Sequence, residues 1–278
     1  MHRSLNYTMA LLLAAAFAIP AAASHSWNNY HWARTTSPFD LLVVDSVTSE
    51  WQGQFDMSLL QWSLSEKLNN VVGAGADDNK TRKRCQMVNG QMRVCNAAYG
   101  QNGWLGMATI NIDANGHITR GTVKVNDSYG WYFDANFGLD NHVMCQEIGH
   151  IYGLGHTSED GTSQGTCMDY STSTNSQWPN QHDYYQLNLI YGHLDSYNSY
   201  AASSGSSGTT DGGGCTAPPG KGCNKHEAPD GVPPGAFRVY SRPGSHGDLG
   251  HADFVLPDDE GGLWVFHATL LPDDAARR

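Results

Sequence analysis

Residues 146–156, QEIGHIYGLGH, carry two histidines and a carboxylate at spacings that suit a metal centre. On an α-helix, positions 146 and 150 lie one turn apart, about 6 Å along the axis and about 40° around it, so both side chains can approach one ion. Gly153 allows a turn with positive φ, after which His156 can return as a third ligand. We therefore predict a metal site formed by Gln146, His150 and His156. Glu147 would lie beside it as the general base toward a metal-activated water.

The first ligand in this prediction is an amide rather than an imidazole. Gln146 would bind through its amide oxygen, which is a weaker and harder donor than imidazole. His142 lies two turns before the second ligand, about 12 Å along the axis, and Cys145 points about 140° away from it. His182 and His193, further along the chain, stay open as alternative ligands. The opposing interpretation is a helix that has lost its metal and serves only structure.

The segment as a whole resembles the active-site motif of the metzincin zinc proteases, H-E-x-x-H-x-x-G-x-x-H followed by a methionine turn. Gln146 stands where the first histidine of that motif would be, and Cys167-Met168-Asp169-Tyr170 stands at the methionine turn. Thr157, directly after the third ligand, is closest to the matrixins, and the chain is similar to the matrixin-like metzincins secreted by microbes.

The resemblance implies roles for further residues. Met168 would form the Met-turn, and Tyr170 would support the oxyanion or join the metal ligands, as in astacins and serralysins. The opposing interpretation treats both as ordinary packed side chains. By the same resemblance, an edge strand at Leu105, Gly106 and Met107 would pair with an extended substrate.

The implied function is a secreted endopeptidase that uses one zinc ion and hydrolyses peptide bonds in protein or peptide substrates. The alternative is a catalytically impaired protein of the metzincin fold that acts as a secreted binding module. We expect a monomer. A formal net charge of −11 argues against nucleic-acid and anionic-membrane partners, since both need basic surfaces.

The beginning of the chain and its cysteines indicate export. Residues 1–23 read as a secretory signal peptide, because a short basic start precedes the apolar run ALLLAAAFAI and small residues that end at Ala23. That run is too short to span a bilayer. Six cysteines suit an oxidising compartment, and their spacing predicts three local disulfides, Cys85–Cys95, Cys145–Cys167 and Cys215–Cys223. Six cysteines permit 15 pairings, so other pairings stay open.

The remaining chain predicts an α+β fold with a twisted mixed sheet, an active-site helix and a C-terminal helix. We divide it into an extended segment (24–40), a metzincin-like catalytic domain (41–197), a Gly/Pro/Ser-rich linker (198–235) and a small β-rich C-terminal segment (236–278). Within the domain we predict strands at 39–45, 67–72, 104–113 and 117–126, a hairpin of 82–88 with 91–96, and helices at 55–64, 140–152 and 180–194.

Two groups of polar residues receive no firm role. His246, His251 and His267 are scattered through the C-terminal segment, and we interpret none of them as a ligand. Loops at 77–79 and 134–138 contain the Asp and Asn residues of calcium sites, but such loops are common, so calcium stays an open alternative to zinc alone.

Overall fold

The computed structural model describes residues 25–200, 236–242, 244, 248–272 and 275. The predicted signal peptide and the predicted Cys215–Cys223 pair lie outside the described residues. Within them the chain forms an α+β fold with a mixed nine-stranded sheet and five α-helices. The predicted fold class is confirmed at that level.

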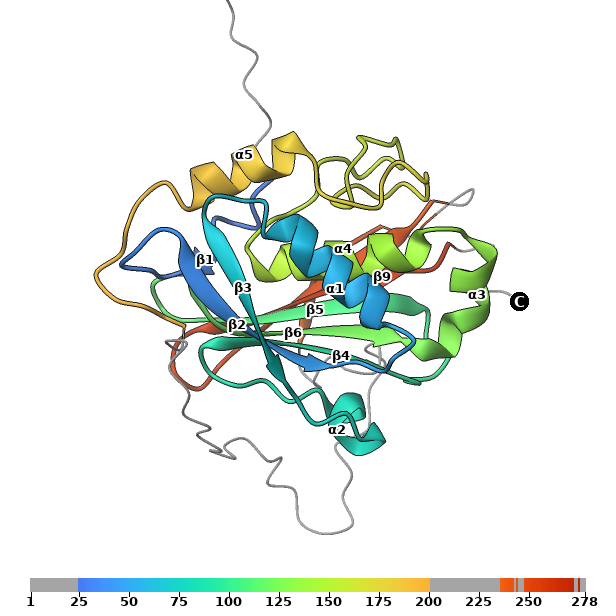
Figure 1. The fold of residues 1–278 in the computed structure, drawn as a ribbon, viewed down its shortest axis with the longest axis horizontal. Coiled ribbons are helices and arrows are strands. Elements are labelled where there is room, and N and C mark those ends of the chain that lie inside the picture. Colours follow the sequence, from blue (N-terminus) through green and yellow to red (C-terminus); the bar gives the residue numbers. More distant parts are fainter. Residues whose placement is uncertain (1–24, 201–235, 243, 245–247, 273–274, 276–278) are drawn as a thin grey trace, which may run out of the picture.

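Strands from the N-terminal and the C-terminal parts of the described chain belong to one sheet (Figure 1). The order is β3 (Leu68–Ala74), β2 (Phe39–Ser46), β4 (Gln91–Ala97), β6 (His117–Asn126), β5 (Trp104–Ile112), β9 (Leu263–Leu270), β8 (Gly250–Pro257) and β7 (Phe237–Arg242). The short β1 (His31–Trp32) pairs in parallel with the start of β6. The strands from β3 to β6 in this order are parallel, whereas β5, β9, β8 and β7 are each antiparallel to their neighbours.

The long helices cover one face of this sheet (Figure 1). Helices α1 (Gln52–Trp62) and α4 (Leu139–Ile151) pack on each other, and α4 packs on β5 and β6. α5 (Gln181–Ile190) lies further out, α2 (Asn79–Arg84) precedes β4, and a 3₁₀ turn (Asp127–Tyr129) leads into α3 (Gly130–Ala135). A Cβ added at Gly106 would lie 2.6 Å from Val143 Cγ1 and 2.7 Å from Glu147 Oε1, so the bare glycine lets α4 approach β5.

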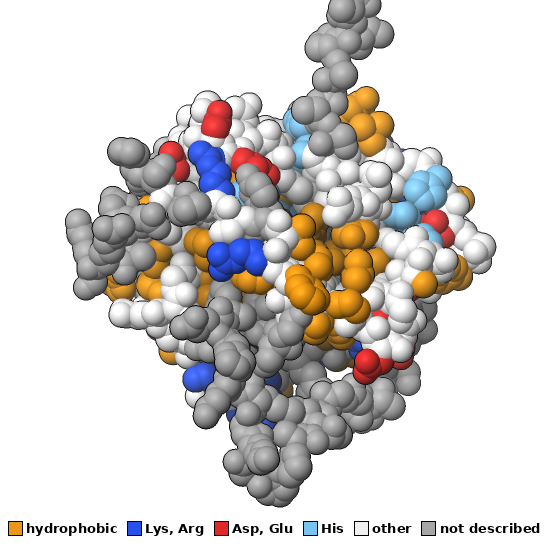
Figure 2. Space-filling model, turned by 180° about the vertical axis from the view of Figure 1, so that it is seen from behind, with side chains coloured by type: hydrophobic (Ala, Val, Ile, Leu, Met, Phe, Trp, Pro, Cys, Tyr) orange, Lys and Arg blue, Asp and Glu red, His pale blue; other side chains and the backbone are white. Residues whose placement is uncertain are grey.

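Apolar cores form on both faces of the sheet. The larger core lies between the sheet and the helices. The smaller core, on the opposite face, joins Trp104 and Met107 of β5 to Phe254 of β8 and Phe266 of β9. Apolar side chains are also prominent in the view of the molecule from behind (Figure 2). Fully burying a large apolar side chain contributes about 1.5–3 kcal/mol, so the C-terminal strands share a substantial core with the rest of the chain.

Most predicted elements are present, with ends shifted by a few residues, but the predicted hairpin at 82–96 is wrong. Residues 79–84 form α2, because the Asp78 carboxylate accepts hydrogen bonds from the backbone N–H groups of Lys80 and Thr81 at 3.0 and 3.1 Å. Gly90, at φ 74°, still turns the chain, but the strand that follows pairs in parallel with β2 and β6.

Two of the three predicted disulfides are present. Cys85–Cys95 joins the C-terminal end of α2 to β4 across a Cα–Cα distance of 5.9 Å. Cys145–Cys167 joins α4 to the residue before Met168 across 6.0 Å. Cross-linking loops of this size contributes about 3 kcal/mol in the chain-entropy model, so the second disulfide holds α4 against the Met168 loop.

The C-terminal strands change the expected role of β5. They were predicted as a small appendage, and they instead continue the main sheet through eight paired positions of β9 and β5. Gly106 pairs with Thr269 and Met107 with Ala268, while the other side of β5 pairs with β6. The prediction that Leu105, Gly106 and Met107 form an open edge for substrate is therefore wrong for this structure, because β9 already occupies that edge.

Candidate metal centre

Helix α4 and the turn after it position the first two candidate ligands. α4 begins after Gly138, which has φ 80°, and His150 lies in its last turn. Gly153 has φ 89°, and a Cβ there would lie 1.9 Å from the backbone oxygen of Tyr30. A side chain at this position is excluded both by the conformation and by the neighbouring backbone. The turn returns His156 to His150, and their Nε2 atoms lie 3.1 Å apart.

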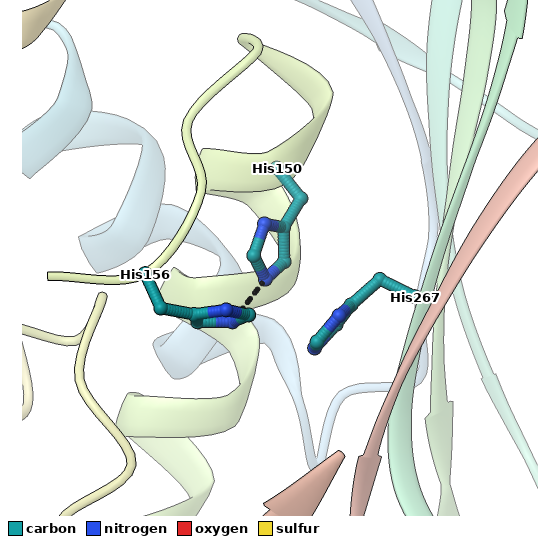
Figure 3. A group of neighbouring side chains, drawn as sticks. All are labelled: His150, His156 and His267. Carbon is teal, nitrogen blue, oxygen red and sulfur yellow. Dashed lines mark hydrogen bonds between the residues drawn. The ribbon is translucent and has the colours of Figure 1, made fainter. Parts of the chain in front are cut away.

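The third imidazole of this group comes from β9. His150, His156 and His267 each offer a ring nitrogen within 4.8 Å of the other two (Figure 3). The ring centroid of His267 lies 4.1 Å from that of His150 and 4.7 Å from that of His156. Our interpretation of His267 as a residue without a ligand role is corrected, because the pairing of β9 with β5 carries it to α4.

The other nitrogens of two of these rings are engaged in a way that leaves Nε2 free to bind. His150 Nδ1 donates to the backbone oxygen of Leu154 at 2.8 Å. His267 Nδ1 lies 2.8 Å from Asp253 Oδ1 on β8. His267 Nε2 is buried and has no hydrogen-bond partner among the described residues. Metal-binding histidines show this arrangement, in which a carbonyl or carboxylate holds the far nitrogen.

The environment keeps all three imidazoles neutral. Burial lowers the pKa of His150 and His156 well below the usual value, and the neighbouring histidines lower both further. Burial also lowers the pKa of His267 to about 3. Only the neutral imidazole has a lone pair for a metal, so the site is prepared to bind a cation without first losing protons.

Glu147 lies on α4 about one turn before His150, in a fully buried position. Its Oε1 accepts a hydrogen bond from Thr269 Oγ1 at 2.6 Å. Its Oε2 is buried without a hydrogen-bond partner among the described residues. Burial raises the pKa of Glu147 to about 8, although the bond from Thr269 opposes this shift. The carboxyl group can therefore exchange a proton near neutral pH, as a general base or acid requires.

Gln146 is held by protein groups at both ends of its amide. Its Nε2 donates to the backbone oxygen of Asp169 at 2.9 Å, and its Oε1 lies 2.7 Å from Thr269 Oγ1. The structure thus brings His150 and His156 together as predicted, and the third imidazole of the group is His267. Ligation by Gln146 stays a prediction without support from these contacts.

Tyr170 and Met168 lie close to the site, on the loop held by the second disulfide. The Tyr170 hydroxyl is 2.6 Å from His156 Nδ1 and 2.9 Å from Nε2, and its ring stacks on His251 with a centroid distance of 4.3 Å. Met168 is fully buried, and its sulfur would lie 2.5 Å from a Cβ added at Gly149 on α4. Met168 therefore supports the helix beneath the histidines. A catalytic role of Tyr170 stays a prediction.

The sequence contained a signal for the missed residues. His251 and Asp253 on β8 face Thr269 and His267 on β9 in directly paired positions. Polar residues at every second position of otherwise apolar strands indicate a polar site on one face of a sheet, because side chains alternate between faces. Buried polar residues are more informative than exposed ones.

Other residues with expected or open roles lie elsewhere. His182 stacks on His25, whose Nε2 is 3.1 Å from Asp183 Oδ1, and these three form a separate group that could hold a metal. In the two loops considered for calcium, the Asp78 carboxylate caps α2, and Asp134 lines a cavity with other carboxylates. Several His/Asp groups of the chain could thus hold a metal ion.

No described helix combines the length and the apolar character that crossing a bilayer requires. The two disulfides are consistent with an extracellular protein. Comparisons with models of protein families, with curated protein sequences and with solved structures found no match.

Proposed function

We propose that this chain is a secreted, monomeric zinc endopeptidase of the matrixin-like metzincin type, with His150, His156 and His267 as the zinc ligands. The observation that carries the proposal is the convergence of three imidazoles, with the buried carboxyl group of Glu147 on the same helix one turn before His150. The spacing of Glu147, His150, Gly153 and His156 supports peptide hydrolysis as the reaction.

The residues fit zinc in number and type, and the separation between two of them fits as well. Tetrahedral zinc with nitrogen ligands at 2.0–2.1 Å holds those nitrogens about 3.3 Å apart. The Nε2 atoms of His150 and His156 are 3.1 Å apart, and His267 Nε2 is buried without a described partner. Three protein ligands leave a fourth position open, which is the arrangement of catalytic rather than structural sites.

Each nearby group has a role in this proposal. When bound, zinc polarises a carbonyl group and makes water nucleophilic near neutral pH. Glu147 would take a proton at Oε2, the oxygen without a described partner, and later pass it to the leaving amine. Thr269 holds the other oxygen and so orients the carboxyl group. The Tyr170 hydroxyl, already beside His156, would donate to the developing oxyanion.

A second candidate function is a secreted zinc-binding module without catalysis. It is favoured by the position of β9, which pairs with β5 and contacts both Gln146 and Glu147 through Thr269. A substrate cannot add to β5 in this arrangement and would have to reach the site from the side of His156, the only one of the three histidines that is not fully buried.

The test compares His267→Leu with Gln146→Leu, two buried changes that each remove one candidate ligand. Zinc bound per chain is measured after dialysis, and cleavage is measured with a peptide library. We expect His267→Leu to lose one zinc and all cleavage, and Gln146→Leu to keep the zinc. Near-UV circular dichroism checks that both variants are folded.

Glu147→Gln separates the two candidate functions. If the chain is an endopeptidase, this variant keeps its zinc and loses cleavage, because only the proton acceptor is changed. A parent protein that holds zinc but cleaves no peptide would support the binding module. Loss of zinc from Gln146→Leu, with retention by His267→Leu, would contradict the ligand set.

A further inference from the structure

A second group of histidines lies where the N-terminal segment meets the start of β6 and the chain after α5. His31 belongs to β1, His117 is the first residue of β6, and His193 and Asp195 follow α5. The view from behind shows histidine side chains at the surface of the molecule (Figure 2). The exposed fractions of the His31, His117 and Asp195 side chains are 13, 13 and 10 %, whereas His193 is 55 % exposed.

Several ligand atoms of this group lie close to the separations of a tetrahedral site. Asp195 Oδ1 lies 3.7, 3.5 and 3.4 Å from the Nε2 atoms of His31, His117 and His193. The Nε2 atoms of His31 and His193 are 3.2 Å apart. Zinc with nitrogen and oxygen ligands at 2.0–2.2 Å requires separations of about 3.3–3.5 Å. His31, His117 and Asp195 each offer a ligand atom within 4.8 Å of the other two, and a movement of the exposed His193 side chain would complete the coordination.

Hydrogen bonds made by Nδ1 of His31 and His117 leave the Nε2 lone pairs of both rings facing the centre of the group. His31 Nδ1 donates to the backbone oxygen of Asn29 at 2.8 Å. His117 Nδ1 lies 2.7 Å from the Tyr197 hydroxyl, which donates its own hydrogen to Asp113, so His117 is the donor in the first bond. In the neutral form of each ring, Nε2 is then the acceptor.

Asp195 is oriented in the same way. Its Oδ2 accepts a hydrogen bond from the backbone N–H of Arg34 at 2.9 Å, and its own N–H donates to the Arg34 backbone oxygen at 2.7 Å. The remaining Oδ1 faces the three imidazoles. Because a carboxylate oxygen and two Nε2 acceptors cannot hydrogen-bond to one another, a cation at their centre satisfies all of them at once.

We propose that His31, His117, His193 and Asp195 bind a second, structural zinc ion. Four protein ligands close the coordination shell, which distinguishes this site from the three-ligand centre on α4. The ligands come from three separate segments, so the ion would join the N-terminal segment and the chain after α5 to the sheet. Each ligand except the exposed His193 has a hydrogen-bonded partner behind it, as established zinc ligands do.

The test counts zinc in the full chain and in two variants of the same loop. His193→Ala removes the most exposed ligand, and Leu194→Ala is its matched control, because Leu194 is 59 % exposed and lies between two ligands without being one. The proteins are stripped with a chelator, titrated with zinc alone, and heated to measure Tm with and without zinc.

We expect two zinc ions in the parent and in Leu194→Ala, and one in His193→Ala with a smaller rise of Tm on adding zinc. Asp195→Asn is the second variant and should behave like His193→Ala. If His193→Ala and Asp195→Asn bind as much zinc as the parent, the proposal is overturned. A parent that binds one zinc, lost only in His267→Leu, would also overturn it while leaving the centre on α4 intact.

Discussion

The contact between Asp253 and His267 offers a sharp test of the centre on α4, because it changes the zinc site without removing a ligand. In Asp253→Asn the side chain keeps its shape and an oxygen that can accept from His267 Nδ1, but it loses the negative charge. That charge makes the imidazole a stronger donor and stabilises the bound cation. We therefore expect the variant to fold and to bind zinc more weakly.

The size of the effect follows from the geometry. Loss of a partner behind a metal ligand typically costs 10- to 100-fold in affinity, which is about 1.4 to 2.8 kcal/mol. The His267 side chain is 1 % exposed and the bond is 2.8 Å long, but the Asp253 side chain is 23 % exposed. Because water screens this partly exposed carboxylate, its charge contributes less than a buried charge would. We therefore expect a loss of zinc affinity in the lower half of that range, about 10- to 30-fold.

The assay is competition for zinc with a chromogenic chelator at neutral pH. It is run in the His193→Ala background so that the proposed second site does not contribute. Glu260→Gln is the control, because this exposed carboxylate on the turn between β8 and β9 is lost without touching the histidines. Equal zinc affinity of Asp253→Asn and Glu260→Gln would refute the role of Asp253 and weaken the assignment of His267.

Three further predictions concern the fold around the site. Gly106→Ala should lower the free energy of unfolding by about 1–3 kcal/mol, because its Cβ would meet Val143 and Glu147 within 3 Å, and an unchanged denaturant midpoint would contradict this packing. Phe266→Ala should cost about 3–5 kcal/mol, since the ring is 4 % exposed in the core shared by β5, β8 and β9. A loss below about 1 kcal/mol would show that the C-terminal strands are not part of that core. Burial raises the pKa of the Asp127 carboxyl group in the folded protein. At a pH between the ordinary and the raised pKa, the folded state holds a proton that the unfolded state has released. The free energy of unfolding therefore falls as the pH rises through this range. In urea unfolding from acid to neutral pH, the stability of Asp127→Asn relative to the parent should therefore increase, and a constant difference would argue against the shift.

Local spacing was sufficient to predict the part of the site that lies on one continuous segment. His150 and His156 are joined by one helical turn and one glycine, so their convergence follows from backbone geometry alone. The disulfides Cys85–Cys95 and Cys145–Cys167 also close short loops. Such contacts depend on few intervening residues, so they can be predicted from the spacing of residues in the sequence.

The third histidine could not be found in this way, because its position depends on which strands pair. His267 reaches α4 only because β9 adds to β5, a pairing between segments separated by much of the chain. The wrong hairpin at 82–96 has a related cause. The pair Asn89-Gly90 is typical of a hairpin turn, but the cap at Asp78 and the helix after it outweigh that signal.

In the proposed centre on α4, His150, His156 and His267 together hold a zinc ion. Anomalous diffraction at the zinc edge, from crystals of the full chain grown with zinc, measures this directly. We expect a peak about 2.0–2.1 Å from a ring nitrogen of each of the three histidines. A well-ordered crystal with no peak there, or with the ion on Gln146 and His267 turned away, would contradict it.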